Sequence, residues 1–265
     1  TLAVPAWGAN TVRTEFSFLT GIDTARLGID QFNPYRRLVS SELPSLARAF
    51  KKRGYRTVCI HPYPASFYQR DKIFSLLGFD EFIDLKSFTQ AAPQEQGQGP
   101  YVSDHVLTDK IFDTLDRPDE QPLFIFAITM ENHGPLHLER MTSSEEQKWL
   151  SKPLPPDCQE LAIYLRHLAN ADQMVVRLLK CFSTPLAATQ ASIISSHARP
   201  VQLLWYGDHV PVLANMYAQF GFPEGNTDYF LWRSDTARES AVQISQHTHS
   251  PQPMHVSQLA IELLK

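Results

Sequence analysis

The sequence predicts an α/β domain built around a largely parallel sheet. Short β-rich runs alternate along the chain with longer amphipathic stretches, which is the order that strand–helix–strand units produce. Two of the short runs, 122–133 and 201–209, are apolar until they end in polar residues, as expected of strands buried on both faces. The 265 residues, 43% of them hydrophobic, are enough for the core of one large domain, which we assign to residues 1–265.

The first predicted element is a helix that begins near Thr11. Asn10 or Thr11 provides an N-cap, and Val12, Phe16 and Leu19 recur at helical spacing, so they form its buried face. A second interpretation of the same stretch is that Thr11 stands at a helix N-terminus because its oxygen attacks an anionic group.

The later elements follow the same alternation. A helix over 43–54, with Gly54 as its natural stop, leads into a strand over 55–63. The segment 161–182 predicts a long helix, with these residues facing inward: Leu161, Leu165, Leu168, Met174, Val175 and Leu178. The polar or irregular stretches 90–100, 183–200 and 246–255 predict loops.

Composition excludes several classes of protein. A formal net charge of −4, a pI near 6.2 and the lack of any Lys/Arg-rich block exclude nucleic acid as a partner. Cys59, Cys158 and Cys181 lack the spacing of a zinc knuckle or of a disulfide framework. No run reaches the roughly 18 to 20 apolar residues of a membrane span, and the first residues do not resemble a signal peptide. The residues as given predict a soluble piece.

The predicted strands end in residues that can do chemistry. His61, then Asn132 and His133, then Asp208 and His209 follow three strands, and ligands gather at the carboxyl ends of strands in such sheets. Asp208 and His209 can both reach one cation if the chain leaves the sheet there, and Gly207 permits a tight exit. The alternative is that Asp208 caps the segment that follows.

Other polar residues have structural interpretations. Asp104 is predicted to cap a helix N-terminus rather than to bind a metal. His247, His249 and His255 lie in a Pro-rich stretch, so we interpret them as solvated loop histidines and not as a metal cluster.

Four motifs in chain order carry a resemblance to a known family. They are NTVRTEF, HPYPASFYQRD, ENHGP and WYGDH. Together they resemble the sulfatase-type branch of the alkaline phosphatase superfamily, and within it the lipoteichoic acid synthases and related phosphoglycerol or phosphoethanolamine transferases, including sulfatase-like proteins of capsule loci. The resemblance implies an alkaline phosphatase-like fold, a three-layer α/β/α sandwich with a mostly parallel central sheet.

The resemblance also implies a set of site residues. Thr11 matches the family's nucleophile, which is also a metal ligand, and Asp208 and His209 match its ligand pair. His133 matches a histidine of the substrate pocket. The remaining matches, around the phosphate and head group of the substrate, are His61, Tyr68 and Arg70. Arg13, near the nucleophile, either steers anions or lies on an exposed helix face.

The implied activity is a two-step transfer of a phospho-alcohol group. One divalent cation, manganese, magnesium or zinc, would activate the threonine oxygen and polarise the phosphoryl group. The implied donor is a phospholipid or another phospho-alcohol, and the acceptor is a glycan or glycolipid outside the cytoplasmic membrane. Alternatives are a sulfatase or phosphodiesterase of the same fold and an inactive binding domain. A sulfatase is disfavoured because NTVRTEF has neither the Cys nor the Pro of the sulfatase motif.

The resemblance further implies that part of the family's domain is absent from this sequence. Relatives carry one more acidic ligand at the end of a first strand, upstream of the nucleophile, and membrane-anchored relatives carry transmembrane helices before that. We therefore expect that the chain lacks this strand and any membrane region, and that membrane contact would occur only through such a region. Glu15 or Glu131 could replace the missing ligand.

Overall fold

The computed structural model describes residues 1–37, 43–88, 99–118, 121–183, 200–234 and 252–265. Its elements are, in chain order, β1 (Leu2–Ala3), α1 (Thr11–Thr20), η1 (Thr24–Phe32), η2 (Pro34–Arg37), α2 (Leu46–Lys52), β2 (Arg56–Ile60), η3 (Phe67–Gln69), α3 (Arg70–Leu76), β3 (Glu81–Ile83), η4 (Leu85–Phe88), α4 (Asp104–Leu115), β4 (Leu123–Ala127), η5 (Leu136–Leu138), α5 (Ser143–Trp149), η6 (Pro156–Cys158), α6 (Glu160–Ser183), β5 (Gln202–Tyr206), α7 (Ala214–Phe220), β6 (Tyr229–Arg233), β7 (Met254–His255) and α8 (Val256–Leu264).

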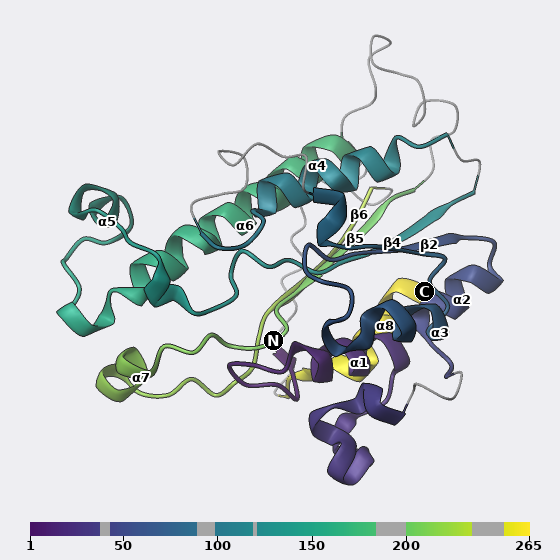
Figure 1. The fold of residues 1–265 in the computed structure, drawn as a ribbon, viewed down its shortest axis with the longest axis horizontal. Coiled ribbons are helices and arrows are strands. Elements are labelled where there is room, and N and C mark those ends of the chain that lie inside the picture. The colour runs from purple at the N-terminus through teal and green to yellow at the C-terminus, as the bar shows by residue number, and fades with distance from the viewer. Residues whose placement is uncertain (38–42, 89–98, 119–120, 184–199, 235–251) are drawn as a thin grey trace.

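These elements are arranged in three layers. Helices α4 and α6 cover one face of the strand layer, and α1, α2, α3 and α8 cover the other (Figure 1). The core is accordingly divided in two. Val58 and Ile60 of β2 pack with α4 and α6, whereas Cys59 packs on the opposite side with Phe16 of α1. This alternation follows from the two-residue side-chain period of a strand. The predicted three-layer α/β/α sandwich is confirmed.

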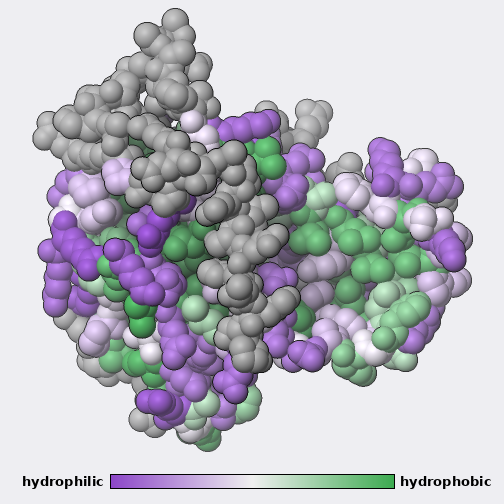
Figure 2. Space-filling model, turned by 180° about the vertical axis from the view of Figure 1, so that it is seen from behind, coloured by the Kyte–Doolittle hydropathy of each residue, from purple (hydrophilic) through white to green (hydrophobic). Residues whose placement is uncertain are grey.

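The central strands are parallel. β2 lies between β3 and β4 and pairs in parallel with both, from Arg56 opposite Leu123 to Ile60 opposite Ala127 on the β4 side. β5 and β6 form an antiparallel pair, and the short β1 and β7 pair in parallel near the two ends of the chain. Among the described residues, no helix combines the length and apolarity needed to cross a bilayer. Both hydrophilic and hydrophobic residues are exposed on the face seen from behind (Figure 2).

Strands β4 and β5 share a layer without sharing a ladder. Phe124 and Phe126 of β4 lie in the same cluster as Leu204 and Tyr206 of β5. The intervening residues of both strands face the other cluster. Nevertheless, the described strands form separate ladders on the two sides, β3-β2-β4 and β5-β6. The layer is thus continuous in its side chains but interrupted in its backbone hydrogen bonds between β4 and β5.

Two sequence-based predictions about burial hold only in part. The run 122–133 contains a strand of only five residues, β4, whose two faces pack against the two core clusters as predicted, although Leu123, Ile125 and Ala127 are only partly buried. In α6, Met174 and Leu178 face inward as predicted, but Leu168 is 48% exposed. The inward position one residue earlier belongs to His167, because that side chain pairs with the buried Glu139. A polar partner, rather than hydrophobicity, sets the orientation of this part of the helix.

Candidate functional site

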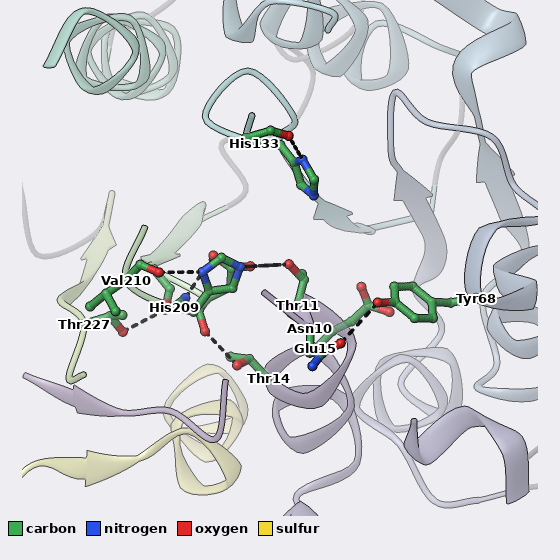
Figure 3. Close-up of polar contacts among 12 residues, drawn as sticks. Asn10, Thr11, Thr14, Glu15, Tyr68, His133, His209, Val210 and Thr227 are labelled. Carbon is green, nitrogen blue, oxygen red and sulfur yellow. Dashed lines mark hydrogen bonds and ion pairs between the residues drawn. The ribbon is translucent and has the colours of Figure 1, made fainter. Parts of the chain in front are cut away.

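Thr11 is the first residue of α1, and its side chain faces Asp208 and His209. The hydroxyl donates to Asp208 Oδ2 at 2.5 Å and lies 3.4 Å from His209 Nε2 (Figure 3). Asn10, the N-cap, has a left-handed backbone with φ 65° and makes no side-chain cap. The first-helix prediction is correct, since Val12, Phe16 and Leu19 are all buried. Thr11 does not cap its own helix, which agrees with the second interpretation of this stretch.

Two hydrogen bonds hold the start of α1 against the segment that follows β5. Thr14 Oγ1 donates to the backbone oxygen of Asp208 at 2.7 Å, and Gly8 N–H donates to the backbone oxygen of Val210 at 3.0 Å. Gly8 has φ +62°, and a Cβ there would lie 2.6 Å from the side chain of Val212. Only glycine therefore allows this close approach without a shift, and the approach is what brings Thr11 to His209.

Gly207 has a different role from the predicted one. It is not among the glycines with positive φ, so a tight exit from the strand is not the reason for glycine here. A Cβ at this position would lie 3.1 Å from the Cβ of Thr227, whose hydroxyl donates to the Gly207 oxygen at 2.7 Å. Close packing against Thr227 accounts for the glycine.

The imidazole of His209 is oriented by its neighbours. Nδ1 lies 2.9 Å from the backbone oxygen of Val210, so this nitrogen carries the proton and donates. The lone pair of Nε2 then points toward Thr11 and toward Asp208 Oδ2, which is 3.3 Å away. The other oxygen of Asp208 accepts from the His209 backbone N–H at 3.0 Å. This arrangement, in which one ring nitrogen is fixed by a carbonyl and the other is left free, is typical of histidines that bind metals.

The three groups suit a divalent cation. A hydroxyl, a carboxylate and an imidazole, with ligand atoms within 3.4 Å of one another, are the donor types that zinc and manganese accept. Within the described parts of the chain, no third His, Cys, Asp or Glu joins Asp208 and His209. Glu15 and Glu131, considered as replacements for a further ligand, both bond to other residues, described below.

His61 and His133 approach the site from the ends of β2 and β4. The two rings are connected through Tyr63 and Tyr101, with successive centroid distances of 6.0, 6.3 and 5.3 Å. His133 is exposed and its ring points toward Thr11 (Figure 3). Burial, followed by the charge of Arg70, lowers the pKa of His61 to about 3. His61 is therefore neutral at pH 7 and can bond a substrate but not protonate it, which leaves His133 as the candidate proton donor.

Arg70 lies beneath the site, in a buried ion pair. Its Nη2 donates to Glu15 at 2.9 Å, both side chains are 2% exposed, and Tyr35 donates to the same carboxylate. The Arg70 charge also lies 5.3 Å from the ring of Tyr68. Nε and Nη2 both bond to Glu15, and the remaining nitrogen, Nη1, is buried without a hydrogen bond to the described residues. Sequence reasoning did not find the Glu15 partner.

Tyr68 lies on the opposite side of Thr11 from His209 (Figure 3). Its hydroxyl is 3.5 Å from the Asn10 Oδ1. Among the described residues other than glycine, only Asn10, Tyr68 and Gln69 have positive φ. Such strained backbones cost about 1 to 3 kcal/mol each and concentrate at functional sites. Their occurrence on both sides of Thr11 supports a functional interpretation of Tyr68.

Arg13 has a packing role instead. Its guanidinium lies 5.4 Å from the centre of the Phe32 ring of η1. Burial is the main influence on its pKa, which it lowers, and Asp23 opposes that effect. Two residues along a helix correspond to a rotation of about 200°, so Arg13 and Thr11 leave α1 in nearly opposite directions. The structure therefore does not support Arg13 as an anion-steering residue of this site.

Two further predictions, that Asp104 is an N-cap and that His255 is a solvated loop histidine, need correction. The N-cap of α4 is Ser103 and not Asp104, which is the first helical residue and is fully buried. His255 caps α8, because its side chain accepts from the Ser257 backbone N–H. His247 and His249 lie outside the described residues. Within the part that is described, His255 thus has a structural role.

The sequence was compared with known families and proteins. The family model described as Sulfatase matches residues 2–265. The capsular polysaccharide biosynthesis protein RkpI of Rhizobium meliloti (strain 1021) is 30% identical over 245 residues, which are 92% of this chain and 39% of that protein. The chain spans only 32% and 39% of the length of the first curated relatives that it matches.

Solved structures share the fold. The phosphoglycerol transferase GacH of Streptococcus pyogenes, in complex with sn-glycerol-1-phosphate, superposes with a TM-score of 0.69 at 20% identity, over 99% of this chain and 63% of that one. The C-terminal periplasmic domain of EcEptC from Escherichia coli, in complex with zinc, gives a TM-score of 0.60 at 16% identity, over 98% and 67% of the two chains. These matches confirm the alkaline phosphatase-like fold that the four motifs imply.

Proposed function

Because this chain belongs to the sulfatase family, we propose that it is the catalytic domain of a metal-dependent phosphotransferase. The proposed reaction moves phosphoglycerol or phosphoethanolamine to a hydroxyl of a cell-envelope or capsule glycopolymer through a threonine-linked intermediate. The observation that carries the proposal is the contact between the Thr11 hydroxyl, at the N-terminus of α1, and Asp208, which lies 197 positions later in the chain.

In the first half-reaction, Thr11 Oγ1 forms a bond to the phosphorus of a phosphodiester donor. The bond between phosphorus and the oxygen of the departing alcohol breaks. The Thr11 proton passes to Asp208 Oδ2, which already accepts its hydrogen bond, and His133 gives a proton to the departing oxygen. A divalent cation bound by Thr11, Asp208 and His209 would supply Lewis-acid stabilisation of the negative charge on these oxygens.

In the second half-reaction, a hydroxyl of the acceptor replaces Thr11 on the phosphorus. The bond between the acceptor oxygen and phosphorus forms as the bond to Thr11 Oγ1 breaks. The acceptor proton passes to His133, and Thr11 regains its proton from Asp208, so both side chains return to their starting state. Backbone N–H groups at the start of α1 stabilise the phosphoryl charge throughout.

The remaining predicted residues would bind the substrate without exchanging protons. Neutral His61 accepts a hydrogen bond, Tyr68 contacts the head group, and Nη1 of Arg70 donates to a phosphoryl oxygen. The buried Glu15 holds the other nitrogens of Arg70, so this guanidinium has a fixed direction before substrate arrives. A fixed donor loses little entropy on binding.

The names of the relatives support the class of donor and acceptor. GacH is a phosphoglycerol transferase and RkpI a capsular polysaccharide biosynthesis protein, so we propose a phospho-alcohol or phospholipid donor and a glycan or glycolipid acceptor. EcEptC is described as a periplasmic domain that binds zinc. By analogy we place this domain on the extracytoplasmic face of the cell membrane, and we leave manganese, magnesium and zinc as candidates.

We also propose that the complete catalytic domain contains one more strand, between β4 and β5. The proposal rests on the interrupted ladder between these strands, whose side chains nonetheless face the same clusters. A parallel strand there would end beside Thr11, and an acidic side chain at its end would supply a fourth ligand. A chain extended upstream should then bind a divalent cation more tightly than these 265 residues, as measured by titration calorimetry. Equal affinities would contradict the extra strand.

The central test is metal-dependent release of p-nitrophenol from a phosphodiester analogue, with intact-mass detection of a covalent adduct. We expect both signals in the unaltered chain and neither in Thr11→Ala. Thr20→Ala is the matched control, because Thr20 lies in the same helix and its hydroxyl bonds to nearby backbone groups away from the site, donating to the Phe16 oxygen and accepting from the Ile22 N–H. An adduct that survives in Thr11→Ala would disprove the proposed nucleophile.

The same assay separates the two alternatives. A hydrolase of the same fold would release product to water but would not transfer the group to an added glycan hydroxyl. An inactive binding domain would take up metal, as measured by calorimetry, with neither product nor adduct. Sulfate ester cleavage that exceeds phosphodiester cleavage would favour the sulfatase interpretation.

A further inference from the structure

A buried carboxylate lies two residues before His133. After β4 ends at Ala127, the chain turns, and His133 N–H donates to the Met130 backbone oxygen at 2.9 Å. Met130 and Glu131 are 6% and 7% exposed, whereas His133 is exposed. The turn therefore has a buried half and an exposed half that carries the imidazole.

Glu131 joins this turn to both helices on its side of the sheet. Oε2 accepts from the backbone N–H of Asp104, the first residue of α4, at 2.7 Å. Oε1 accepts from the side-chain amide of Asn170 in α6 at 2.6 Å. A carboxylate at a helix N-terminus is also stabilised by the free N–H groups and the dipole of the helix, and α4 has 12 residues.

The exposed half of the turn is held by Tyr101, which lies three residues before Asp104 in the chain. The Tyr101 hydroxyl donates to the backbone oxygen of Gly134 at 3.1 Å, and its ring lies 5.3 Å from that of His133, edge to face. Residues 101–104 thus contact the turn on both sides of His133. The Tyr101 bond is exposed, whereas the Glu131–Asp104 bond is buried and the Glu131–Asn170 bond is partly buried, so water competes least with the Glu131 bonds.

We propose that Glu131 is a positioning residue, which holds His133 over Thr11 by fixing the turn to α4 and α6. Glu131 does not touch the reacting atoms, and its effect on catalysis passes through the location of the imidazole. The catalytic part of this inference rests on the proposed function, but the structural part does not. A displacement of about 1 Å at a catalytic group can lower a rate by about a hundredfold.

The test compares two substitutions of Glu131. Glu131→Gln keeps an oxygen for the Asp104 N–H, and Asn170 can turn its amide to accept from the new NH2 group, so both connections survive without the charge. Glu131→Ala removes both connections. The first measurement is the NMR signal of the His133 ring, the Cε1–Hε1 cross-peak, identified by its loss in His133→Gln. It requires no turnover.

We expect the His133 signal to shift and broaden in Glu131→Ala and to remain in place in Glu131→Gln. In the phosphodiester assay, kcat should fall by roughly 10- to 100-fold in the Ala variant with little change in KM. The Gln variant should stay within a few-fold of the unaltered chain. An unchanged signal and kcat in Glu131→Ala, or a Gln variant as impaired as the Ala variant, would overturn the proposal.

Glu139→Ala is the matched control. Glu139 is 8% exposed and also joins the connection after β4 to α6, through Arg166 and His167. The Glu139→Ala substitution should lower the melting temperature, as Glu131→Ala does, but it should leave the His133 signal in place. If Glu131→Ala does not fold, Asn170→Ala removes one of the two connections and should produce a smaller shift in the same direction. No shift in Asn170→Ala would also count against the proposal.

The two proposals fail in different ways. If the His133 signal depends on Glu131 but Thr11 forms no adduct, the positioning role stands and the proposed function falls. If the Thr11 adduct forms but the His133 signal does not depend on Glu131, the proposed function stands and the positioning role falls.

Discussion

Two carboxylates near the first turn of α1, Glu15 within the helix and Asp208 in the segment after β5, have opposite surroundings. Glu15 is 2% exposed and is matched by the Arg70 guanidinium and the Tyr35 hydroxyl. The side chain of Asp208, which faces Thr11 at the start of α1, is 39% exposed and lies beside the His209 imidazole, with no Lys or Arg paired to it among the described residues. A buried charge with a matching cation is part of the scaffold. An accessible carboxylate beside a hydroxyl and a free imidazole nitrogen is still able to bind a cation.

The largest expected effect comes from removing the charge of the partly exposed Asp208. Asp208→Asn should lower turnover of a phosphodiester by about a thousandfold or more, which corresponds to roughly 4 kcal/mol of transition-state stabilisation. The free energy of unfolding should change by less than about 1 kcal/mol, because the side chain is partly exposed. Steady-state kinetics and urea unfolding would measure the two quantities. If Asp208→Asn lost stability but kept its activity, Asp208 would be a structural carboxylate and not a functional one.

Removing the Arg70 guanidinium, which pairs with Glu15, should lower stability. Arg70→Ala leaves Glu15 as an unpaired buried charge, and we expect the free energy of unfolding to fall by about 3 to 5 kcal/mol. The double variant Glu15→Gln/Arg70→Met removes both charges and should recover most of the loss. Urea denaturation of the three proteins at pH 7 tests this. A loss below about 1 kcal/mol in Arg70→Ala would mean that the pair is not buried as described.

A third carboxylate, Asp104, is buried with no cationic partner among the described residues, and it tests the same comparison. Burial, followed by the charge of Glu131, raises the pKa of Asp104 to about 7 from a reference value of 3.8. Between these two values the folded state binds the proton and the unfolded state does not. The stabilising effect of this proton is therefore complete below about pH 4 and is lost as the pH rises through 7.

We expect this group to lower the free energy of unfolding by about 2 to 4 kcal/mol between pH 4 and pH 8. In Asp104→Asn that part of the pH dependence should disappear, and the variant should be more stable than the unaltered chain at pH 8. Urea unfolding across this pH range measures both. Identical pH profiles for the two proteins would show that Asp104 titrates normally.

The smallest expected effect concerns the hydrogen bond from the Thr14 hydroxyl to the backbone oxygen of Asp208. Thr14 is fully buried and donates to the Asp208 backbone oxygen. Thr14→Val keeps the shape but removes the donor, so the free energy of unfolding should fall by about 1 kcal/mol. Metal affinity should weaken only a few-fold. If the affinity fell as far as in Asp208→Asn, the backbone at this position would matter as much as the carboxylate.

Local patterns in the sequence predict the elements and the residues at strand ends. The alternation of apolar runs and helical periods predicts the layered fold, and His61, His133 and His209 do follow strands, as expected. The direct contact between Thr11 and the Asp208–His209 pair was also expected from the family motifs. These features succeed because they depend on short stretches of chain, whose periodicity and end residues are visible without knowledge of partners.

Features that depend on distant partners were not predicted. The motif around Arg70 gives no sign of its buried partner Glu15, which lies 55 positions away in the chain. Gly8 is required by the side chain of Val212, which no local signal indicates. In α6, His167 takes an inward position that hydrophobic spacing gives to Leu168, because Glu139 lies opposite. A sequence specifies which side chains could pair, but only the packed chain determines which of them do.

The 197 positions that separate Thr11 from Asp208 have a consequence for how the protein is made. The residues that would activate Thr11 leave the ribosome long after it does, and the Gly8–Val210 bond cannot form before then. Until Asp208 has been synthesised, a nascent chain carries Thr11 as an ordinary alcohol. Under the proposed mechanism, the site therefore becomes competent only when the segment after β5 meets the start of α1, and a translation product that stops before Asp208 would not carry out the reaction.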